Sequence, residues 1–378
     1  MTNFIFWLCL ACLFWTFLGY PLAVLLAAPA SRLKVREGPP PAKIALIVAA
    51  HNEEEVIGQK IQNCLNLAAG QWDLEIVIVS DGSTDSTNRI LENHQGISER
   101  LRFIQYQPRR GKAYALNAGL SVAHGEIIVF SDANVILEPN ALVHLLRPFA
   151  DTSVGAVSGH VRIKGKGNAE ISGEGLYMRF ENLVQKAESR VWSTVGVDGA
   201  LFAIRRELAP VLAADTVIDD FAISMEAPLH RQRIVFAQDA LATEEAIPSV
   251  KNEIKRKARI VAGGYQYLFH LGGRLLDLPK GFLFMFFSHK VLRWLAPFFL
   301  LGLLISSAAL RGPAGYVALT LQIFFYLFAT TSLLFPGLRN RTLFYFPFYF
   351  SAVNLAALAG AYRFFRGRHS SLWDKVSR

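Results

Sequence analysis

Apolar residues are concentrated in four long stretches that contain no charged side chain. These stretches, of 25, 17, 24 and 20 residues, are Phe4–Ala28, Trp294–Leu310, Gly315–Leu338 and Leu343–Tyr362. A helix needs about 20 apolar residues to cross a bilayer. The pattern therefore predicts a transmembrane anchor over residues 1–30 and transmembrane helices over residues 294–365.

Between these stretches, apolar runs of strand length alternate with segments that show apolar residues at helical spacing. The four runs are Ile44–Ala50, Glu75–Ser80, Leu101–Tyr106 and Ile127–Phe130. Strand and helix in alternation are typical of a mostly parallel sheet covered by helices, so we expect an α/β domain over residues 44–250. Further along, the pattern predicts a helix over Glu174–Val191, a strand over Ala200–Ile204 and a helix over Phe221–Leu229.

The remaining segments are predicted from their composition. Residues 31–43, which end near three prolines, form a linker, and residues 366–378 form a basic tail. Residues 251–293 are expected to be amphipathic or interfacial. Lys251–Arg259 is predicted to be a basic amphipathic helix, and Lys290 and Arg293 interrupt the apolar run Phe282–Phe287 before the next span.

Polar side chains follow three of the predicted strands. Asn52 and Glu53 follow the first, Asp81 follows the second, and Asp132 and Asn134 follow the fourth. The carboxyl ends of parallel strands line the crevice where open α/β sheets bind ligands, and the side-chain oxygens of Asp132 and Asn134 suit a divalent cation such as Mg²⁺ or Mn²⁺. A turn at Asp132 and a helix cap at Asn52 are the structural alternatives.

A basic loop, Arg109-Arg110-Gly111-Lys112, precedes a predicted helix, where it could bind phosphate or be a solvated turn. The sequence contains no GxGxxG after the first strand and no GxxxxGK[ST] motif. Dinucleotide-binding and P-loop proteins are therefore excluded.

The net charge of +9 does not indicate nucleic-acid binding, because much of it lies beside the membrane stretches. Four basic residues follow the first stretch, which predicts a cytoplasmic domain by the positive-inside rule. Ala28-Pro29-Ala30 resembles a signal-peptide cleavage site, but no Lys or Arg precedes Phe4, so we expect an uncleaved anchor. Three cysteines and nine scattered histidines predict neither a disulfide framework nor a zinc site.

Five segments together resemble the inverting family 2 glycosyltransferases of the GT-A fold, over residues 44–260. They are AAHNEEE at 49–55, VSDGSTD at 79–85, RRGKAYALNAG at 109–119, SDAN at 131–134 and VDGALFAIRR at 197–206. The resemblance implies that Asn52, Glu53 and Asp81 hold the nucleotide and that Asp132 belongs to the metal-binding DxD motif. Asn134 replaces the last acid of that motif, which leaves the affinity and identity of the metal open.

The resemblance also implies that Asp220 is the general base and that Asp198 and Gly199 lie on the acceptor side. Capping of the next helix by Asp220 and a β-turn at Gly199 are the alternatives. Arg259 stands where processive members carry a QxxRW motif, and it could bind the diphosphate. The glutamine and tryptophan of that motif are absent here.

Tyr177 and Glu181 are one helical turn apart and are candidates to face an acceptor channel, although the apolar stripe of their helix is better explained as core. The basic residues of the tail disagree with four simple membrane crossings. Two alternatives stay open: either Phe282–Trp294 completes a hairpin, or Leu343–Tyr362 does not cross.

The predicted function is sugar transfer from a nucleotide sugar, with UDP implied by the resemblance, to a growing exopolysaccharide or glycan. The chain would act with Mg²⁺ or Mn²⁺ in a plasma or inner membrane, with lipids and export or assembly subunits as its partners. One rival is transfer of a single sugar to a lipid acceptor. The other is a non-catalytic scaffold that binds nucleotide sugars.

Overall fold

The first strand of the chain, β1 (Lys43–Ala50), lies inside a sheet that the described residues form with eight strands. The computed structural model describes residues 1–31, 33–39, 41–67, 72–164, 173–245 and 250–367. Along the sheet the strands follow the order β3-β2-β1-β4-β7-β6-β8-β5. The other strands are β2 (Asp73–Asp81), β3 (Leu101–Tyr106), β4 (Ile127–Ser131), β5 (Ile136–Leu137), β6 (Val154–Lys164), β7 (Leu201–Arg205) and β8 (Arg233–Glu245).

The expected parallel arrangement is confirmed for β3, β2, β1 and β4, whose pairs are all parallel. The direction changes at β7, which is antiparallel to both β4 and β6. Strand β8 then pairs parallel with β6 and antiparallel with the short β5. The fold is therefore an α/β domain with a mixed, largely parallel sheet.

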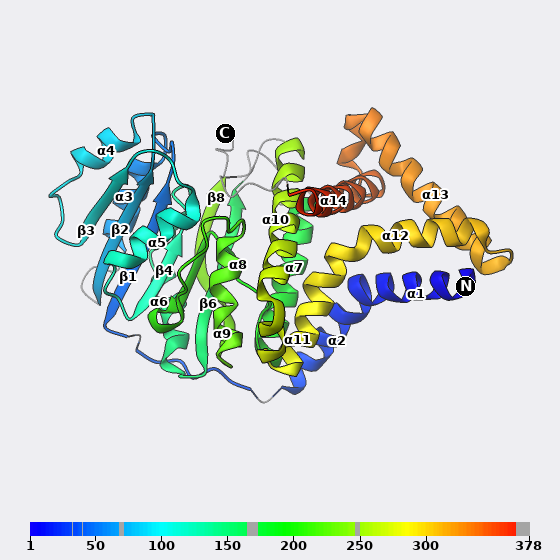
Figure 1. The fold of residues 1–378 in the computed structure, drawn as a ribbon, viewed down its shortest axis with the longest axis horizontal. Helices are drawn as coiled ribbons and strands as arrows, with labels where there is room; N and C mark the ends of the chain where they lie inside the picture. Colours follow the sequence, from blue (N-terminus) through cyan, green and yellow to red (C-terminus); the bar gives the residue numbers. More distant parts are fainter. Residues whose placement is uncertain (32, 40, 68–71, 165–172, 246–249, 368–378) are drawn as a thin grey trace.

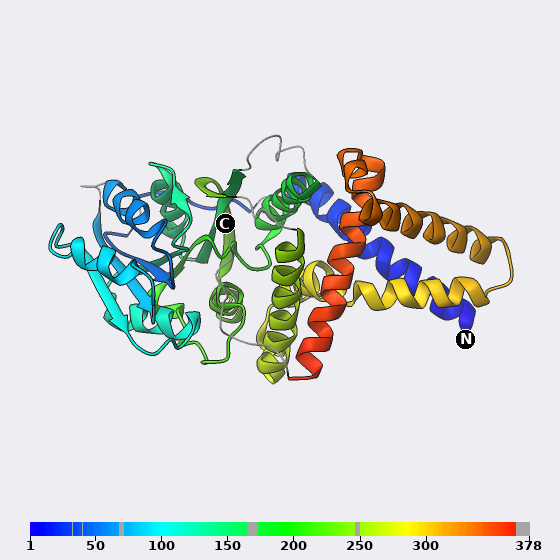
Figure 2. The same cartoon turned by 90° about the horizontal axis from the view of Figure 1, so that it is seen from above.

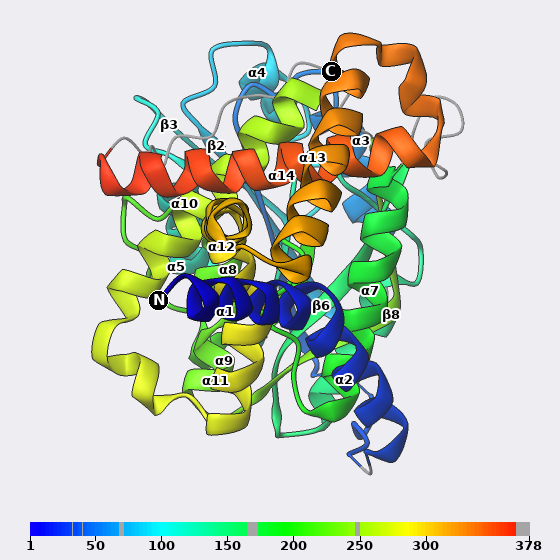
Figure 3. The ribbon, with the colours of Figure 1, turned by 90° about the vertical axis from the view of Figure 1, so that its right-hand side faces the viewer.

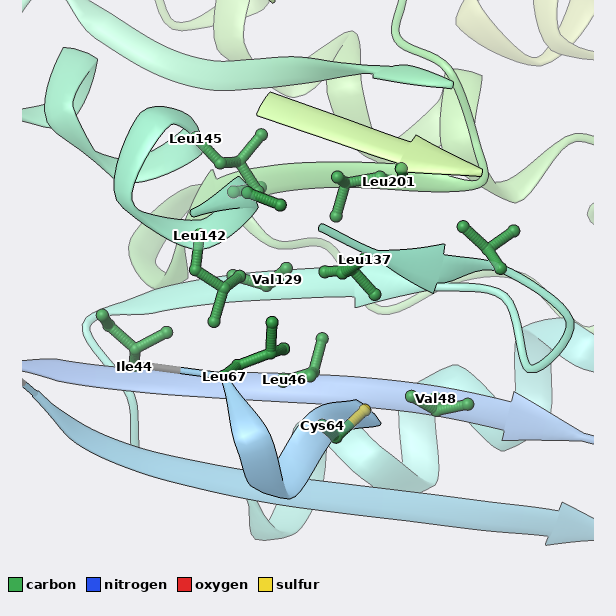
Figure 4. Close-up of a cluster of buried hydrophobic side chains, with 14 of the residues drawn as sticks. Ile44, Leu46, Val48, Cys64, Leu67, Val129, Leu137, Leu142, Leu145 and Leu201 are labelled. Atoms are coloured by element: carbon green, nitrogen blue, oxygen red, sulfur yellow. The ribbon is translucent and has the colours of Figure 1, made fainter. Parts of the chain in front are cut away.

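Helices cover both faces of this sheet (Figure 1). Residues of β1 alternate between the two faces, as the strand period of two requires. Ile44, Leu46 and Val48 pack with α3 (Ile57–Asn66) and α6 (Ala141–Leu146), and Figure 4 shows this cluster. On the other face, Ile47 packs in the cluster of α5 (Lys112–Val122). The remaining helices of the domain are α4 (Thr87–Asn93), α7 (Gly173–Val191), α8 (Asp219–Ser224), α9 (Glu226–Leu229) and α10 (Val250–Leu271).

Four helices in the described part of the chain are long and apolar enough to cross a membrane. They are Thr2–Ala30 (α1 and α2), Lys280–Ala309 (α11 and α12), Pro313–Leu334 (α13) and Thr342–Phe365 (α14). Within the second of these, a π-helical turn at Phe287–Val291 joins α11 (Lys280–Phe286) to α12 (Leu292–Ala309). The segment Phe282–Trp294 is thus part of one continuous helix, and the alternative in which it completes a hairpin is wrong.

The helix α14 is oriented differently from α12 and α13. In Figure 2 it runs crosswise to both, and in Figure 3, where α12 is seen almost end-on, α14 lies across the view. It packs closely on α10, because a Cβ added at Gly360 would lie 2.5 Å from the carbonyl oxygen of Ala258. The helix α14 therefore packs on α10 near its end, and near its start it packs on α13, where Phe346 and Phe350 contact Phe325.

Candidate active site

The centre of the candidate site is an ion-pair cluster around Lys112, the first residue of α5. Its Nζ lies 2.9 Å from Oδ1 of Asp132 and 3.2 Å from Oδ2 of Asp219. Burial lowers the pKa of Lys112, but the two carboxylates outweigh this effect and raise it above its ordinary value. The cluster joins the basic loop, the end of β4 and the start of α8, three segments that the sequence places far apart.

Asp220 lies in the first turn of α8, next to Asp219. Burial and then the charge of Asp219 raise the pKa of Asp220 to about 6, while Lys112 opposes the shift. A carboxylate with a pKa near neutrality is well matched to accept a proton from a hydroxyl group. The position suits the predicted base, and its catalytic role stays a prediction.

Gly199 lies directly against this carboxylate. A Cβ added at Gly199 would lie 2.7 Å from Oδ2 of Asp220. The neighbouring Asp198 is held by Ser158, whose Oγ accepts a hydrogen bond from the Asp198 amide at 2.9 Å. Burial raises the pKa of Asp198, although the amide of Ala200, which donates to its carboxylate, opposes this effect. Gly199 therefore gives room to the side chain of Asp220, and its place on the acceptor side stays a prediction.

Asn134 meets a carboxylate that the sequence did not point to. Its Nδ2 donates a hydrogen bond to Oε1 of Glu244 at 3.1 Å. Burial and the charge of Asp132 raise the pKa of Glu244 to about 7. Glu244 is thus a neighbour of the SDAN segment. The sequence gives no local signal of this contact, because Asn134 and Glu244 are 110 residues apart.

Asp81 is fully buried, and its carboxylate is bound by groups of the basic loop. Oδ1 accepts from the Arg110 amide at 2.6 Å and from the Tyr106 hydroxyl at 3.0 Å, and Oδ2 accepts from the Gly111 amide at 2.9 Å. Asp81 therefore holds the loop that presents Lys112. Its predicted contact with a nucleotide stays a prediction.

Asn52 and Glu53 lie at the carboxyl end of β1, next to the loop that follows β2. Asn52 has a positive φ of 56°, and its Oδ1 accepts from the Thr84 amide at 2.8 Å. The Glu53 amide donates to Oγ1 of Thr87 at 2.8 Å. Both residues lie at the same edge of the sheet as Asp81, where the parallel strands β1 and β2 end, and their contact with a nucleotide stays a prediction.

Arg259 supports the segment before the predicted base. Its Nη1 donates to the carbonyl of Val217 at 3.1 Å, and Gln266 of the same helix accepts from the Val217 amide at 3.1 Å. After this segment, Phe221 packs against Tyr267, Phe286 and Trp294. The segment 217–221, which contains the predicted base, therefore packs against α10 and against the apolar helix Lys280–Ala309. The predicted contact of Arg259 with a diphosphate stays a prediction.

A buried lysine lies beneath the SDAN segment and was also missed. Lys60 of α3 is fully buried, and its Nζ donates to Oγ of Ser131 at 2.8 Å and to the carbonyl of Val135 at 2.6 Å. Burial lowers the pKa of Lys60, whereas Cys64 and Asp132 act in the opposite direction. Lys60 thus holds the SDAN segment by hydrogen bonds to its first residue, Ser131, and to the residue that follows it, Val135.

Glu181 is buried against the membrane helix and does not line an open channel. It pairs with Arg293 and with Nε2 of His289, the latter at 3.1 Å. Burial alone would raise the pKa of Glu181, but Arg293 and His289 hold it well below its ordinary value. The expectation that Glu181 faces an acceptor channel is therefore wrong. The side chain of Tyr177 lies outside the described residues.

The oxygen donors of the site fit a hard divalent cation. Asp132 offers a carboxylate and Asn134 an amide oxygen, which are ligands that Mg²⁺ and Mn²⁺ accept. The ammonium group of Lys112 beside Asp132 shows that this position already holds a positive charge. Within the described residues, no group of three His, Cys, Asp or Glu side chains is arranged to hold a metal ion. Any cation here would therefore take further ligands from substrate or water.

Comparison with known proteins agrees with this arrangement. Residues 45–211 match the family model described as glycosyl transferase family 2. Over 236 residues the chain is 28% identical to poly-beta-1,6-N-acetyl-D-glucosamine synthase of Staphylococcus aureus (strain COL), covering 60% of this chain and 55% of that protein. The synthase of the same name from Staphylococcus epidermidis is 24% identical over the same shares. The chain thus spans about half the length of the curated relatives it matches.

Among solved structures, a mannosyltransferase from Pyrobaculum calidifontis in complex with GDP-Man and Mn²⁺ has a similar fold. The TM-score is 0.73, with 23% sequence identity, and the match covers 98% of this chain and 100% of the other. The shared fold includes the membrane helices as well as the α/β domain, since nearly the whole of both chains is matched. Residues 45–211 of this protein therefore match the glycosyl transferase family 2 model, and they lie in an α/β domain of the GT-A fold that has apolar helices on both sides of it in the described chain.

Proposed function

We propose that the protein is a membrane-bound, inverting glycosyltransferase that transfers a sugar from a nucleotide sugar to a growing exopolysaccharide. The observation that carries this proposal is the cluster in which Lys112 joins Asp132 and Asp219 beside Asp220. It combines a cation-binding carboxylate, a group that can bind phosphate and a base in one place. The relatives named as polysaccharide synthases support the choice of acceptor.

The proposed reaction is a single displacement at the anomeric carbon. The acceptor hydroxyl forms the new C–O bond and loses its proton to a carboxylate oxygen of Asp220, while the bond from the sugar to the diphosphate breaks. Lys112 is placed to bind the diphosphate, since its ammonium group lies at the site's centre. A divalent cation at Asp132 and Asn134 would neutralise the charge on the leaving group. No covalent intermediate with the protein is needed, so the configuration inverts.

Turnover of a panel of UDP- and GDP-sugars by the purified protein in lipid nanodiscs tests this proposal. We expect product with Mn²⁺ or Mg²⁺, none with excess chelator, and losses of at least about 10²-fold for Asp132→Asn and Asp220→Asn. Asp239→Asn, at an exposed acid on β8, is the matched control. Binding without turnover for every donor would refute the enzyme proposal and favour the scaffold.

The same experiment distinguishes a polymerase from transfer of a single sugar to a lipid. The absence of the glutamine and tryptophan near Arg259 favours the single addition, because an aromatic platform for an acceptor sugar is missing there. A ladder of products in the mass spectrum would support the polysaccharide synthase. One added sugar for each lipid acceptor would support the rival.

The number of membrane crossings, which the sequence left open, is the second part of the proposal. We propose that Thr2–Ala30, Lys280–Ala309 and Pro313–Leu334 cross the membrane, while α14 lies along the cytoplasmic surface. The crosswise direction of α14 and its packing on α10 support this arrangement (Figure 2). It returns the exposed Arg363 and Arg366 to the cytoplasmic side, in agreement with the positive-inside rule.

Single cysteines in a background without Cys9, Cys12 and Cys64 test the topology. In intact cells, a membrane-impermeant maleimide should label Arg311→Cys, between α12 and α13, and should not label Arg366→Cys until the cells are opened. Labelling of both positions in intact cells would show that α14 crosses the membrane.

A further inference from the structure

The last acid of the metal motif is replaced by Asn134, and the structure places another acid beside it. Glu244 accepts a hydrogen bond from Nδ2 of Asn134 at 3.1 Å. An amide that donates through its nitrogen turns its oxygen away from that partner. The contact therefore selects one of the two orientations of the Asn134 amide.

The backbone fixes the position of Glu244 relative to Asn134. Strand β5 begins two residues after Asn134 and pairs antiparallel with β8, Ile136 opposite Thr243 and Leu137 opposite Ala242. Continuing this register places residue 244 opposite residue 135, next to Asn134. On its other side β8 pairs with β6, where Glu244 lies opposite Ile163. The carboxylate is thus held by a strand with partners on both edges.

The partners of Glu244 show that it belongs to the site and not to the surface. Glu244 is mostly buried, and its charge interacts with those of Asp132, Arg256 and Asp198. The next residue, Glu245, is exposed. Successive residues of a strand point to opposite faces, so the two adjacent acids differ in whether they reach the site.

We propose that Glu244 is a positioning residue of the cation site, which orients the amide oxygen of Asn134 and supplies the negative charge that Asn134 lacks. The inference rests on the proposed metal-dependent function. Groups that hold a metal ligand in place commonly change metal affinity by about 10- to 100-fold when they are removed. A carboxylate beside the ligand also strengthens the attraction for a divalent cation.

Mn²⁺ binding tests this inference without relying on turnover. Free Mn²⁺ is measured by electron paramagnetic resonance during titration of the purified full chain, with UDP or GDP present in excess. We expect Glu244→Ala to weaken binding about 10- to 100-fold. Glu244→Gln can keep the hydrogen bond but not the charge, so its loss of Mn²⁺ affinity should be smaller than that of Glu244→Ala. Glu245→Ala, the exposed neighbour, should bind as the unaltered protein does.

A double variant separates charge from fold. Asn134→Asp combined with Glu244→Gln moves the acid into the motif and should restore Mn²⁺ affinity to within a few-fold of the original, whereas a purely structural role of Glu244 would not be rescued. Thermal unfolding of each variant identifies any that fail to fold. If the unaltered protein binds no Mn²⁺ with either nucleotide, the proposed metal dependence fails. If it binds Mn²⁺ and the folded Glu244→Ala and Glu244→Gln variants bind equally well, or the double variant is not rescued, this inference alone fails.

Discussion

Replacement of Gly199 by alanine tests whether the position of Asp220 limits the reaction. The new Cβ would lie 2.7 Å from Oδ2, 3.0 Å from Cγ and 3.1 Å from Cβ of Asp220. Real Cβ atoms essentially never approach another atom closer than 3.0 Å, so the carboxylate must move by at least a few tenths of an ångström. The backbone of Gly199 is not in the left-handed region, so alanine itself adds no φ strain.

The size of the effect follows from this displacement. Catalytic groups must be held within about 0.5 Å of their productive position, and a misplacement of about 1 Å can cost about 10²-fold in rate. We therefore expect kcat to fall about tenfold in Gly199→Ala. The clash falls on the end of one side chain, so the free energy of unfolding should change by only about 1 kcal/mol.

The assay is the initial rate of nucleoside diphosphate release, measured with and without acceptor, together with thermal unfolding. Gly273→Ala is the matched control, because a Cβ at Gly273 meets no atom within 4 Å and should leave both readouts unchanged. A folded Gly199→Ala variant with an unchanged kcat would refute the reasoning. A change confined to the KM of the acceptor would instead assign Gly199 to the acceptor path.

Three further predictions follow from the site. Because the raised pKa of Asp220 is about 6 and the base must be ionised, kcat/KM should rise about tenfold per pH unit below 6 and level off above it. Asp219→Asn removes a charge that raises this pKa, so the limb of the pH profile should move to lower pH, and an unmoved limb would contradict the assignment. Lys60→Ala leaves the Ser131 hydroxyl and the Val135 carbonyl without their buried donor and opens a cavity. The free energy of unfolding, measured with denaturant, should therefore fall by about 2–4 kcal/mol. An unchanged unfolding midpoint would refute the supporting role of Lys60. Lys112→Met removes the charge between Asp132 and Asp219 and should weaken nucleoside diphosphate binding by about tenfold in calorimetry, an effect that equal affinity would exclude.

Much of the architecture could be predicted from local patterns. The strand Ile44–Ala50 and the membrane stretches are recognisable because apolar runs of a given length have few alternatives in water or lipid. Asp81 and Asp132 could be placed in one crevice because each follows a strand of the same parallel set. These inferences need only the chain near each residue and the direction of the strands.

Other features depend on contacts between distant segments. The strand periodicity around β6 and β8 did not reveal that they join the sheet, and the pairing of β8 with β5 brings Glu244 next to Asn134. The antiparallel β7 brings Gly199 to the end of β4, and Lys112 then meets Asp219 across more than 100 residues. Pairings of this kind are selected by packing and register over the whole sheet, which no local period encodes.

The sequence by itself therefore determined the classes of element, the α/β domain, the membrane stretches and most residues of the candidate site. Only the tertiary structure decided what those residues touch. It placed Glu181 in a buried ion pair, packed α14 against α10, and set Lys60 and Glu244 around the SDAN segment. The physical reason is that hydrophobic periodicity specifies which face of an element is buried, whereas the partner on that face is chosen by the packing of the complete chain.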